Sequence, residues 1–141
     1  MTKKPRTLIH TTCVHSFLRY SRRETRRLLL KVMRGERATG WSVSVAFVAD
    51  AVMQKLNTTF LRPARTTDVL SFSYSDAQMR EGEIVVNLDQ ARRQAPSFGT
   101  TFTDEVSRLL VHGMLHLIGH RDHTERTRLA MRDRENHYLS H

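Results

Sequence analysis

Apolar and polar residues alternate along several short stretches of the chain, and this two-residue period is typical of half-buried β-strands. The clearest stretch is WSVSVAFVAD (residues 41–50), in which Trp41 and Phe47 belong to the apolar set that we expect in the core. Two further strands are predicted in TTDVLSFSYS (66–75) and GEIVVNL (82–88), with a hairpin-like connection between them, and RTLIHTT (6–12) predicts a short first strand.

Apolar residues three and four positions apart predict helices between these strands. In SRRETRRLLLKVMRGER (21–37), Ser21 and Glu24 have the spacing of a capping box ahead of a narrow apolar stripe. Asp50 is expected to cap a second helix, and a short helix is predicted in DQARRQA (89–95).

The longest helical pattern is expected to open at Thr103 and to end at Gly119, a residue that can adopt the left-handed conformation. A last helix starts near Thr124. The core-facing stripe of the long helix is predicted to consist of Val106, Leu110, Gly113, Met114 and Leu117. Strands and helices in this order predict an α+β fold in a single domain, with helices packed on a small mixed β-sheet.

Composition narrows the class of protein. A chain of 141 residues can bury one core, and its apolar fraction of 39% argues against disorder. Cys13 is the only cysteine, so neither an internal disulfide nor a cysteine-based zinc site can form, as expected in a reducing cytoplasm. The sequence has no run long enough for a membrane span and no apolar segment typical of a secretory signal.

The net charge of +9 is local, because residues 1–40 carry eleven Lys and Arg against two Glu. Arg23, Arg27, Lys31 and Arg34 recur on one face of the predicted N-terminal helix. A basic helix of this kind is a candidate contact for an RNA backbone, whose attraction is independent of sequence and sensitive to salt. The alternative is a solvated face that keeps the protein soluble.

The segment HGMLHLIGHRDH (112–123) holds four histidines and an aspartate. His112 and His116 lie one helical turn apart and can direct imidazole nitrogens at one ion. If the chain turns back after the helix, Asp122 or His123 can supply a third ligand. Three protein ligands with an open fourth position are typical of a catalytic zinc site.

Glu105 and Arg108 share a helix face with the two histidines, and we expect this polar edge to line a cleft, where Glu105 could act through water. In zinc peptidases with the pattern H-E-x-x-H, the glutamate is the general base. Gly113 takes that position here, which disfavours a metallopeptidase. The chemistry that remains is metal-assisted: a bound ion lowers the pKa of water and stabilises charge on a phosphoryl oxygen.

The same segment resembles the H-G-x-L-H-L-x-G-Y-D-H signature of the YbeY family, bacterial metal-dependent endoribonucleases that mature ribosomal RNA. LNTTFLRPARTTDVLSF (56–72) resembles the family's L-N-x-x-Y-R…T-D-V-L-S-F block, GEIVVN (82–87) its G-D-I-x-I strand, and MRDRENHYL (131–139) its closing helix. The similarity covers roughly residues 40–139 in the same order.

The resemblance implies a zincin-like His-x-x-x-His helix and one Zn²⁺ held by three side chains. His112 and His116 match the first two ligands. The family's usual third histidine lies six positions after the second, where this chain has Asp122, because the segment is one residue longer than the signature. A family branch with aspartate at this position fits without a gap. Asp122 is therefore the predicted third ligand and His123 the alternative.

A second departure concerns the family's arginine, which aligns with Leu61, so that Arg62 is displaced by one position. We predict that Arg62 binds or polarises the scissile phosphate, because a guanidinium fork matches phosphate oxygens. The alternative is a solvated loop arginine. Asp68 and Ser71 stand in the matched block and are expected to make hydrogen bonds at the end of a strand.

The resemblance implies that residues 1–141 form one endoribonuclease domain, specific for single-stranded RNA. It implies a role in maturing the 3′ end of 16S ribosomal RNA and in late quality control of the 70S ribosome. Ribosomal RNA and the ribosome are then the partners, and we expect a cytoplasmic monomer. The alternative is a ribosome-associated RNA-binding factor whose metal is structural and which has no nuclease activity of its own.

Overall fold

The computed structural model describes residues 7–60, 67–76 and 78–140, with the backbone alone for 58–60. Within these residues, strands and helices mostly alternate along the chain. The strands are β1 (Leu8–Cys13), β2 (Ser42–Val48), β3 (Val69–Ser73) and β4 (Glu81–Asn87). The helices are α1 (Arg22–Gly35), α2 (Asp50–Phe60), α3 (Leu88–Gln94), α4 (Phe102–Leu117) and α5 (Glu125–Leu139), with a 3₁₀ turn over Pro96–Phe98. Each predicted element is present.

The strands form one mixed sheet in the order β1-β2-β4-β3. β1 and β4 pair with β2 in parallel, whereas β3 and β4 form an antiparallel hairpin across the predicted connection. β1 and β3 are therefore the two edges of the sheet. Together with the five helices, this arrangement confirms the predicted single α+β domain.

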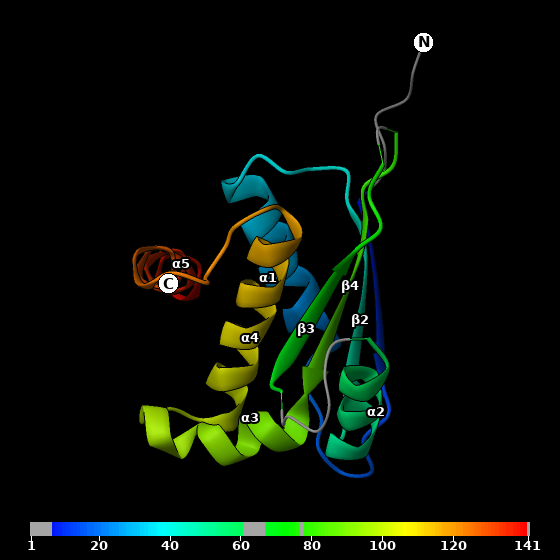
Figure 1. Ribbon diagram of the computed structural model, residues 1–141, viewed down its shortest axis with the longest axis vertical. Helices are drawn as coiled ribbons and strands as arrows, with labels where there is room; N and C mark the ends of the chain where they lie inside the picture. Colours follow the sequence, from blue (N-terminus) through cyan, green and yellow to red (C-terminus); the bar gives the residue numbers. More distant parts are fainter. Residues whose placement is uncertain (1–6, 61–66, 77, 141) are drawn as a thin grey trace.

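The helices cover the two faces of the sheet unequally (Figure 1). α1 and α4 pack side by side on one face, and α5 lies against α4 on the side away from the sheet. α2 packs on the opposite face. No described helix is long and apolar enough to cross a membrane.

The main core lies between the sheet and the pair α1 and α4. The alternating residues of β2 point into it, and Val45 and Phe47 are almost fully buried there with Ile84 of β4. Leu29 of α1 and Leu110 of α4 face them from the helices. Each buried side chain of this size contributes about 1.5–3 kcal/mol relative to an exposed one. The stripe predicted for the long helix is buried as expected.

α4 begins earlier than the sequence pattern predicted. Thr101, not Thr103, lies just before the first turn, and its hydroxyl accepts the backbone N–H of Asp104 at 3.1 Å. The hydroxyl of either threonine could cap a helix, and packing of the half-buried Phe102 against the core adds the extra residues. The prediction for the last helix is confirmed, since Thr124 caps α5.

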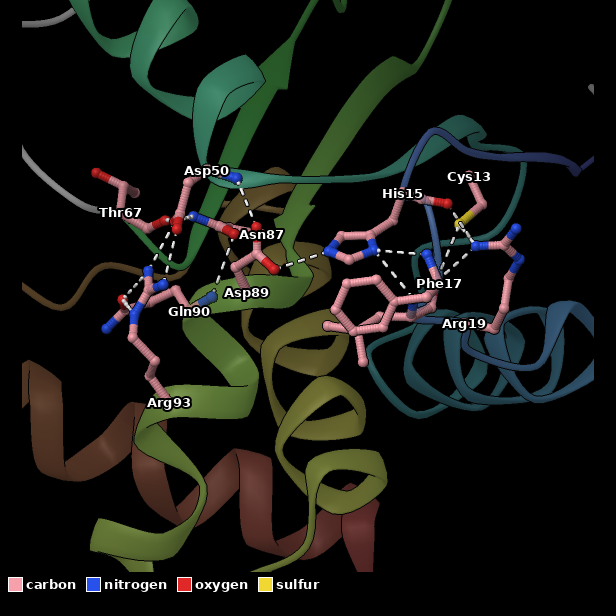
Figure 2. A network of polar contacts seen from close by, with 11 residues as sticks. Cys13, His15, Phe17, Arg19, Asp50, Thr67, Asn87, Asp89, Gln90 and Arg93 are labelled. Carbon is pink, nitrogen blue, oxygen red and sulfur yellow. Dashed lines mark hydrogen bonds and ion pairs between the residues drawn. The ribbon is translucent and has the colours of Figure 1, made fainter.

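A polar network joins the carboxyl ends of the parallel strands (Figure 2). Asp50, which we expected to cap α2, is instead the first helical residue, and its N–H donates to Asp89 at 2.9 Å. Its carboxylate accepts two hydrogen bonds of 2.7 Å from Arg93, which lower the pKa of Asp50. The Asp50 carboxylate also accepts a hydrogen bond from the side-chain amide of Asn87. Nε2 of His15 lies 2.7 Å from Oδ1 of Asp89. The network fixes the loop after β1 against the starts of α2 and α3.

Candidate metal centre

The candidate metal centre forms where α4 ends and the chain turns back. Gly119 has a φ of +108°, so the predicted left-handed glycine is present. The N–H groups of Gly119 and His120 donate to the carbonyls of His116 and Leu115, at 3.1 and 3.0 Å. This pair of hydrogen bonds is a Schellman motif, which ends the helix and reverses the chain. The reversal returns Asp122 to the last turn of α4.

His112, His116 and Asp122 converge on one point. Oδ2 of Asp122 lies 3.3 Å from Nε2 of His112 and 3.3 Å from Nε2 of His116. Each residue offers a ligand atom, and the three atoms lie within 4.8 Å of one another. The side chains are partly exposed, by 19% for His112, 30% for His116 and 36% for Asp122, so the point is open to solvent from one side.

The spacing of these atoms fits a small divalent cation. Two ligands bound about 2.1 Å from one tetrahedral ion lie about 3.4 Å apart, close to both histidine–aspartate distances. Two imidazole nitrogens and a carboxylate oxygen are also ligand types that zinc accepts. The ligand types and the two histidine–aspartate distances therefore fit such an ion, and the partly exposed side chains leave one side open to solvent.

A cavity of about 420 Å³ lies in front of the three residues. Its opposite wall is the edge strand β3 and the residue before it, including Asp68 and Ser71. Ser71 donates a hydrogen bond of 2.9 Å to the carbonyl of Gly113, and Asp68 accepts one of 3.0 Å from Gln94. Asp68 thus makes its hydrogen bond just before β3, whereas Ser71 makes its own from the middle of the strand and not from its end, and both residues also line the cavity.

Gly113 brings α4 unusually close to the sheet. A Cβ at this position would lie 2.8 Å from Cγ2 of Ile84, 3.2 Å from Oγ of Ser71 and 3.4 Å from Cγ2 of Val69. No side chain can occupy this position without displacing the helix or the strands. The position that carries the catalytic glutamate in H-E-x-x-H peptidases is here a packing contact, which agrees with the interpretation drawn from the sequence.

The side of His112 away from the cavity meets a buried ionic cluster. Its Nδ1 lies 2.6 Å from Oε2 of Glu135, a residue of α5 that is 2% exposed. Arg108 donates to Glu135 at 3.2 Å and to both carboxylate oxygens of Glu105, at 2.9 and 2.6 Å. The contact with Glu105 raises the pKa of Arg108, so this guanidinium stays charged.

This cluster corrects one expectation from the sequence. Glu105 and Arg108 share a face of α4 with the histidines, but they do not line the same cavity. Glu105 is 1% exposed, and its oxygens are occupied by Arg108 and by Gln94 at 2.5 Å. Because Arg108 and Gln94 of α3 occupy its carboxylate and it does not line the cavity, Glu105 is not placed to act on a water there.

Two other residues predicted for the site are not among the three clustered side chains. His123 is exposed and does not belong to the cluster formed by the other three side chains. Arg62 lies outside the described residues, so its predicted contact with phosphate stays a prediction. Glu135 was missed by the sequence argument. The feature of the sequence that could have revealed it is an acidic residue between Met131 and Tyr138 on the apolar face of the last helix.

The basic residues of α1 divide into two groups. Arg27 pairs with Glu24, and Lys31 donates to the carbonyls of Tyr138 and Ser140 at the carboxyl end of α5, whereas Arg34 is exposed. In contrast, three exposed arginines line a groove of about 450 Å³ beside β1: Arg22, Arg23 and Arg26. β1 is the sheet edge opposite β3, so this groove lies across the sheet from the cavity with the histidines.

Comparison with known proteins gives consistent matches over most of the chain. The family model described as Endoribonuclease YbeY matches residues 8–141. Endoribonuclease YbeY of Chlorobaculum tepidum is 35% identical over 98 residues, which cover 70% of this chain and 72% of the relative. The protein of the same name from Chloroherpeton thalassium is 30% identical over 115 residues, with 82% of each chain covered.

A third relative, Endoribonuclease YbeY of Carboxydothermus hydrogenoformans, is 40% identical over 100 residues and 70% of each chain. Among solved structures, TM1509 from Thermotoga maritima has a TM-score of 0.65 and 24% identity. The match covers 94% of this chain and 87% of that one. At this identity the likeness concerns the fold alone, and it agrees with the mixed sheet and its helices.

Proposed function

The chain belongs to the YbeY endoribonuclease family, and on that premise we propose that it is a metal-dependent endoribonuclease that cleaves single-stranded RNA. The observation that carries the proposal is the convergence of His112, His116 and Asp122 in the wall of an open cavity. Zinc is the ion we propose, with one per chain, because two imidazoles and one carboxylate suit it. His123 remains the alternative third ligand.

The roles of the chain's own residues follow from their positions. The two histidines and Asp122 would hold the ion and leave one side of it facing the cavity. Such an ion would act as a Lewis acid, which would assist the attack of water on a phosphodiester and stabilise negative charge on a phosphoryl oxygen. We assign Arg62 to the phosphate, since guanidinium groups bind phosphate oxygens in a bidentate manner.

The cavity supports a single strand as the substrate. Its volume of about 420 Å³ is at the small end of ligand pockets, which suits about one nucleotide of an extended chain and not a helical duplex. The arginines that line the groove beside β1 would contact the backbone of the same RNA at a distance from the cleaved bond.

The biological role that we propose is the one shared by this family. The protein would mature the 3′ end of 16S ribosomal RNA and take part in late quality control of the 70S ribosome, with ribosomal RNA and the ribosome as partners. We expect residues 1–141 to act as one endoribonuclease domain, as a monomer, in the cytoplasm.

A ribosome-associated binding factor with a structural metal is the alternative. Structural zinc sites have four protein ligands, whereas the group described here has three and faces a cavity. This difference favours the nuclease.

The test is cleavage of an unstructured RNA oligonucleotide by the zinc-loaded protein, with His116→Ala as the inactive variant. His10→Ala, which removes an exposed histidine of β1, serves as the matched control. We expect His116→Ala to abolish cleavage and to retain the fold and RNA binding, and the control to cleave as the parent does. Cleavage that persists at the parental rate in His116→Ala would contradict the proposal, and RNA binding without any cleavage by the parent would favour the binding factor.

A further inference from the structure

The two ring nitrogens of His112 face two different carboxylates. Nδ1 lies 2.6 Å from Oε2 of Glu135, and Nε2 lies 3.3 Å from Oδ2 of Asp122. An ionised carboxylate can only accept hydrogen bonds, so the shorter contact places the proton of the neutral ring on Nδ1. The lone pair of Nε2 then points toward Asp122 and His116.

We propose that Glu135 is a positioning residue that fixes the tautomer and the orientation of His112 and so prepares Nε2 to bind a metal ion. This inference rests on the proposed function, because it assigns a partner to one of the proposed ligands. A histidine that binds a metal commonly donates its other N–H to a carboxylate, which orients the ring and raises its basicity.

Glu135 can perform this role because it is itself held in place. It projects from α5, is 2% exposed, and uses its two oxygens for different partners: Oε2 meets His112 and Oε1 accepts from Arg108 at 3.2 Å. A carboxylate held at both oxygens cannot rotate away from the imidazole ring without losing a charged hydrogen bond. α5 thereby contributes to the centre although it supplies none of the three proposed ligands.

The network continues behind Glu135 to the opposite wall of the cavity. Arg108 also binds Glu105 with two hydrogen bonds, and Gln94 donates to Glu105 at 2.5 Å and to Asp68 at 3.0 Å. Asp68 lines the same cavity as the proposed ligands. Residues from α3, α4 and α5 therefore form one connected set of hydrogen bonds around the back of the centre.

The charge of this set also favours a cation in front of it. Among the residues that the structure describes, Arg108 is the one guanidinium paired with two almost fully buried carboxylates, Glu105 and Glu135. A buried negative charge without a full counter-charge is costly, and a divalent ion next to His112 would offset that cost.

The chain contains a matched control for this contact. His120 lies 2.6 Å from a carboxylate oxygen of Glu36, the same distance as in the pair formed by His112 and Glu135. Glu36 also accepts hydrogen bonds from Arg134 and Tyr138. His120 is not one of the three clustered side chains, so removing the charge of Glu36 perturbs a similar contact and leaves the centre intact.

The first test is zinc affinity, measured by competition with a chromophoric chelator at neutral pH. We expect Glu135→Gln to weaken zinc binding by about 10- to 100-fold, and Glu36→Gln to bind zinc as the parent does. Glu135→Asp keeps the charge but shortens the side chain, and an affinity between those of Glu135→Gln and the parent is expected. Unfolding of each variant by denaturant shows whether it is folded.

The second test uses the metal-free protein and does not depend on a measurement of RNA cleavage. Nitrogen-15 spectra of the histidine rings in the metal-free protein should show His112 with its proton on Nδ1, and Glu135→Gln should lose this single tautomer. If zinc fails to bind to the parent but the tautomer is as expected, the proposed function fails and the contact with Glu135 stands. Parental zinc affinity in folded Glu135→Gln, or a proton on Nε2 of His112 in the parent, would overturn the inference.

Discussion

Replacing Gly113 by alanine tests the packing that holds the proposed ligands against the sheet. The added methyl group would lie 2.8 Å from Cγ2 of Ile84, a distance at which one of the two groups must move. Ile84 is fully buried in β4, and its Cγ2 is attached directly to Cβ, so it has no freedom to rotate away at low cost. We therefore expect α4 to shift outward from β3 and β4.

The size of the effect follows from two opposing contributions. Alanine is favoured over glycine inside a helix by about 1 kcal/mol, whereas forcing an extra methyl group into a packed core costs about 1–3 kcal/mol. The contact with Ile84 is well below van der Waals distance, and the contact with Ser71 is tight as well. We expect packing to prevail, with a net loss of about 1 kcal/mol in the free energy of unfolding.

Denaturant unfolding of the metal-free protein measures this loss without any contribution from a bound ion. Ala130→Gly at an exposed position of α5 provides the calibration, because it reports the helix preference alone. If Gly113→Ala stabilised the protein by the amount that Ala130→Gly destabilises it, α4 would not be in close contact with the sheet, and this account of the glycine would be refuted.

Three further outcomes are expected. Burial raises the pKa of Glu36, but its three hydrogen-bond donors outweigh burial and lower that pKa from 4.5 to about 2. Because the pKa of Glu36 is lower in the folded than in the unfolded protein, its ionised form adds about 3 kcal/mol at most to the free energy of unfolding above pH 4.5, and this stabilisation is lost as the pH falls toward 2. The free energy of unfolding measured across this range should depend less on acid in Glu36→Gln than in the parent. Thr124→Ala should cost about 1 kcal/mol in the same assay, since Thr124 and Thr127 form a reciprocal cap, and an unchanged stability would contradict that role. Arg23→Gln should reduce the slope of log affinity against log salt for single-stranded RNA by about 0.7, and an unchanged slope would remove Arg23 from the RNA contact.

The elements of the fold were predictable because their signals are local. The alternation in β2 and the stripe on α4 record which face of each element is buried, and Thr124 and Gly119 mark a helix start and a helix end by their own chemistry. Helix boundaries were less certain where two residues could play the same part, as with Thr101 and Thr103.

The grouping of His112, His116 and Asp122 was expected from spacing and from the turn at Gly119, because all three lie within one short segment. The partners behind them were not predictable in this way. Glu135 meets His112 across 23 residues of sequence, and only the packing of α5 on α4 brings them together. For the same reason Glu105 was expected to face the cleft, since its helix face alone cannot show that Gln94 of α3 and Arg108 occupy its carboxylate.

Zinc content per chain, determined by elemental analysis of the purified, dialysed protein beside Asp122→Ala and His123→Ala, shows whether the metal centre exists and which residue completes it. We expect about one zinc per chain in the parent and in His123→Ala, and its loss in Asp122→Ala. Zinc that is lost with His123→Ala and kept with Asp122→Ala would show that the third ligand is misassigned. A parent that binds no zinc would contradict the metal centre itself.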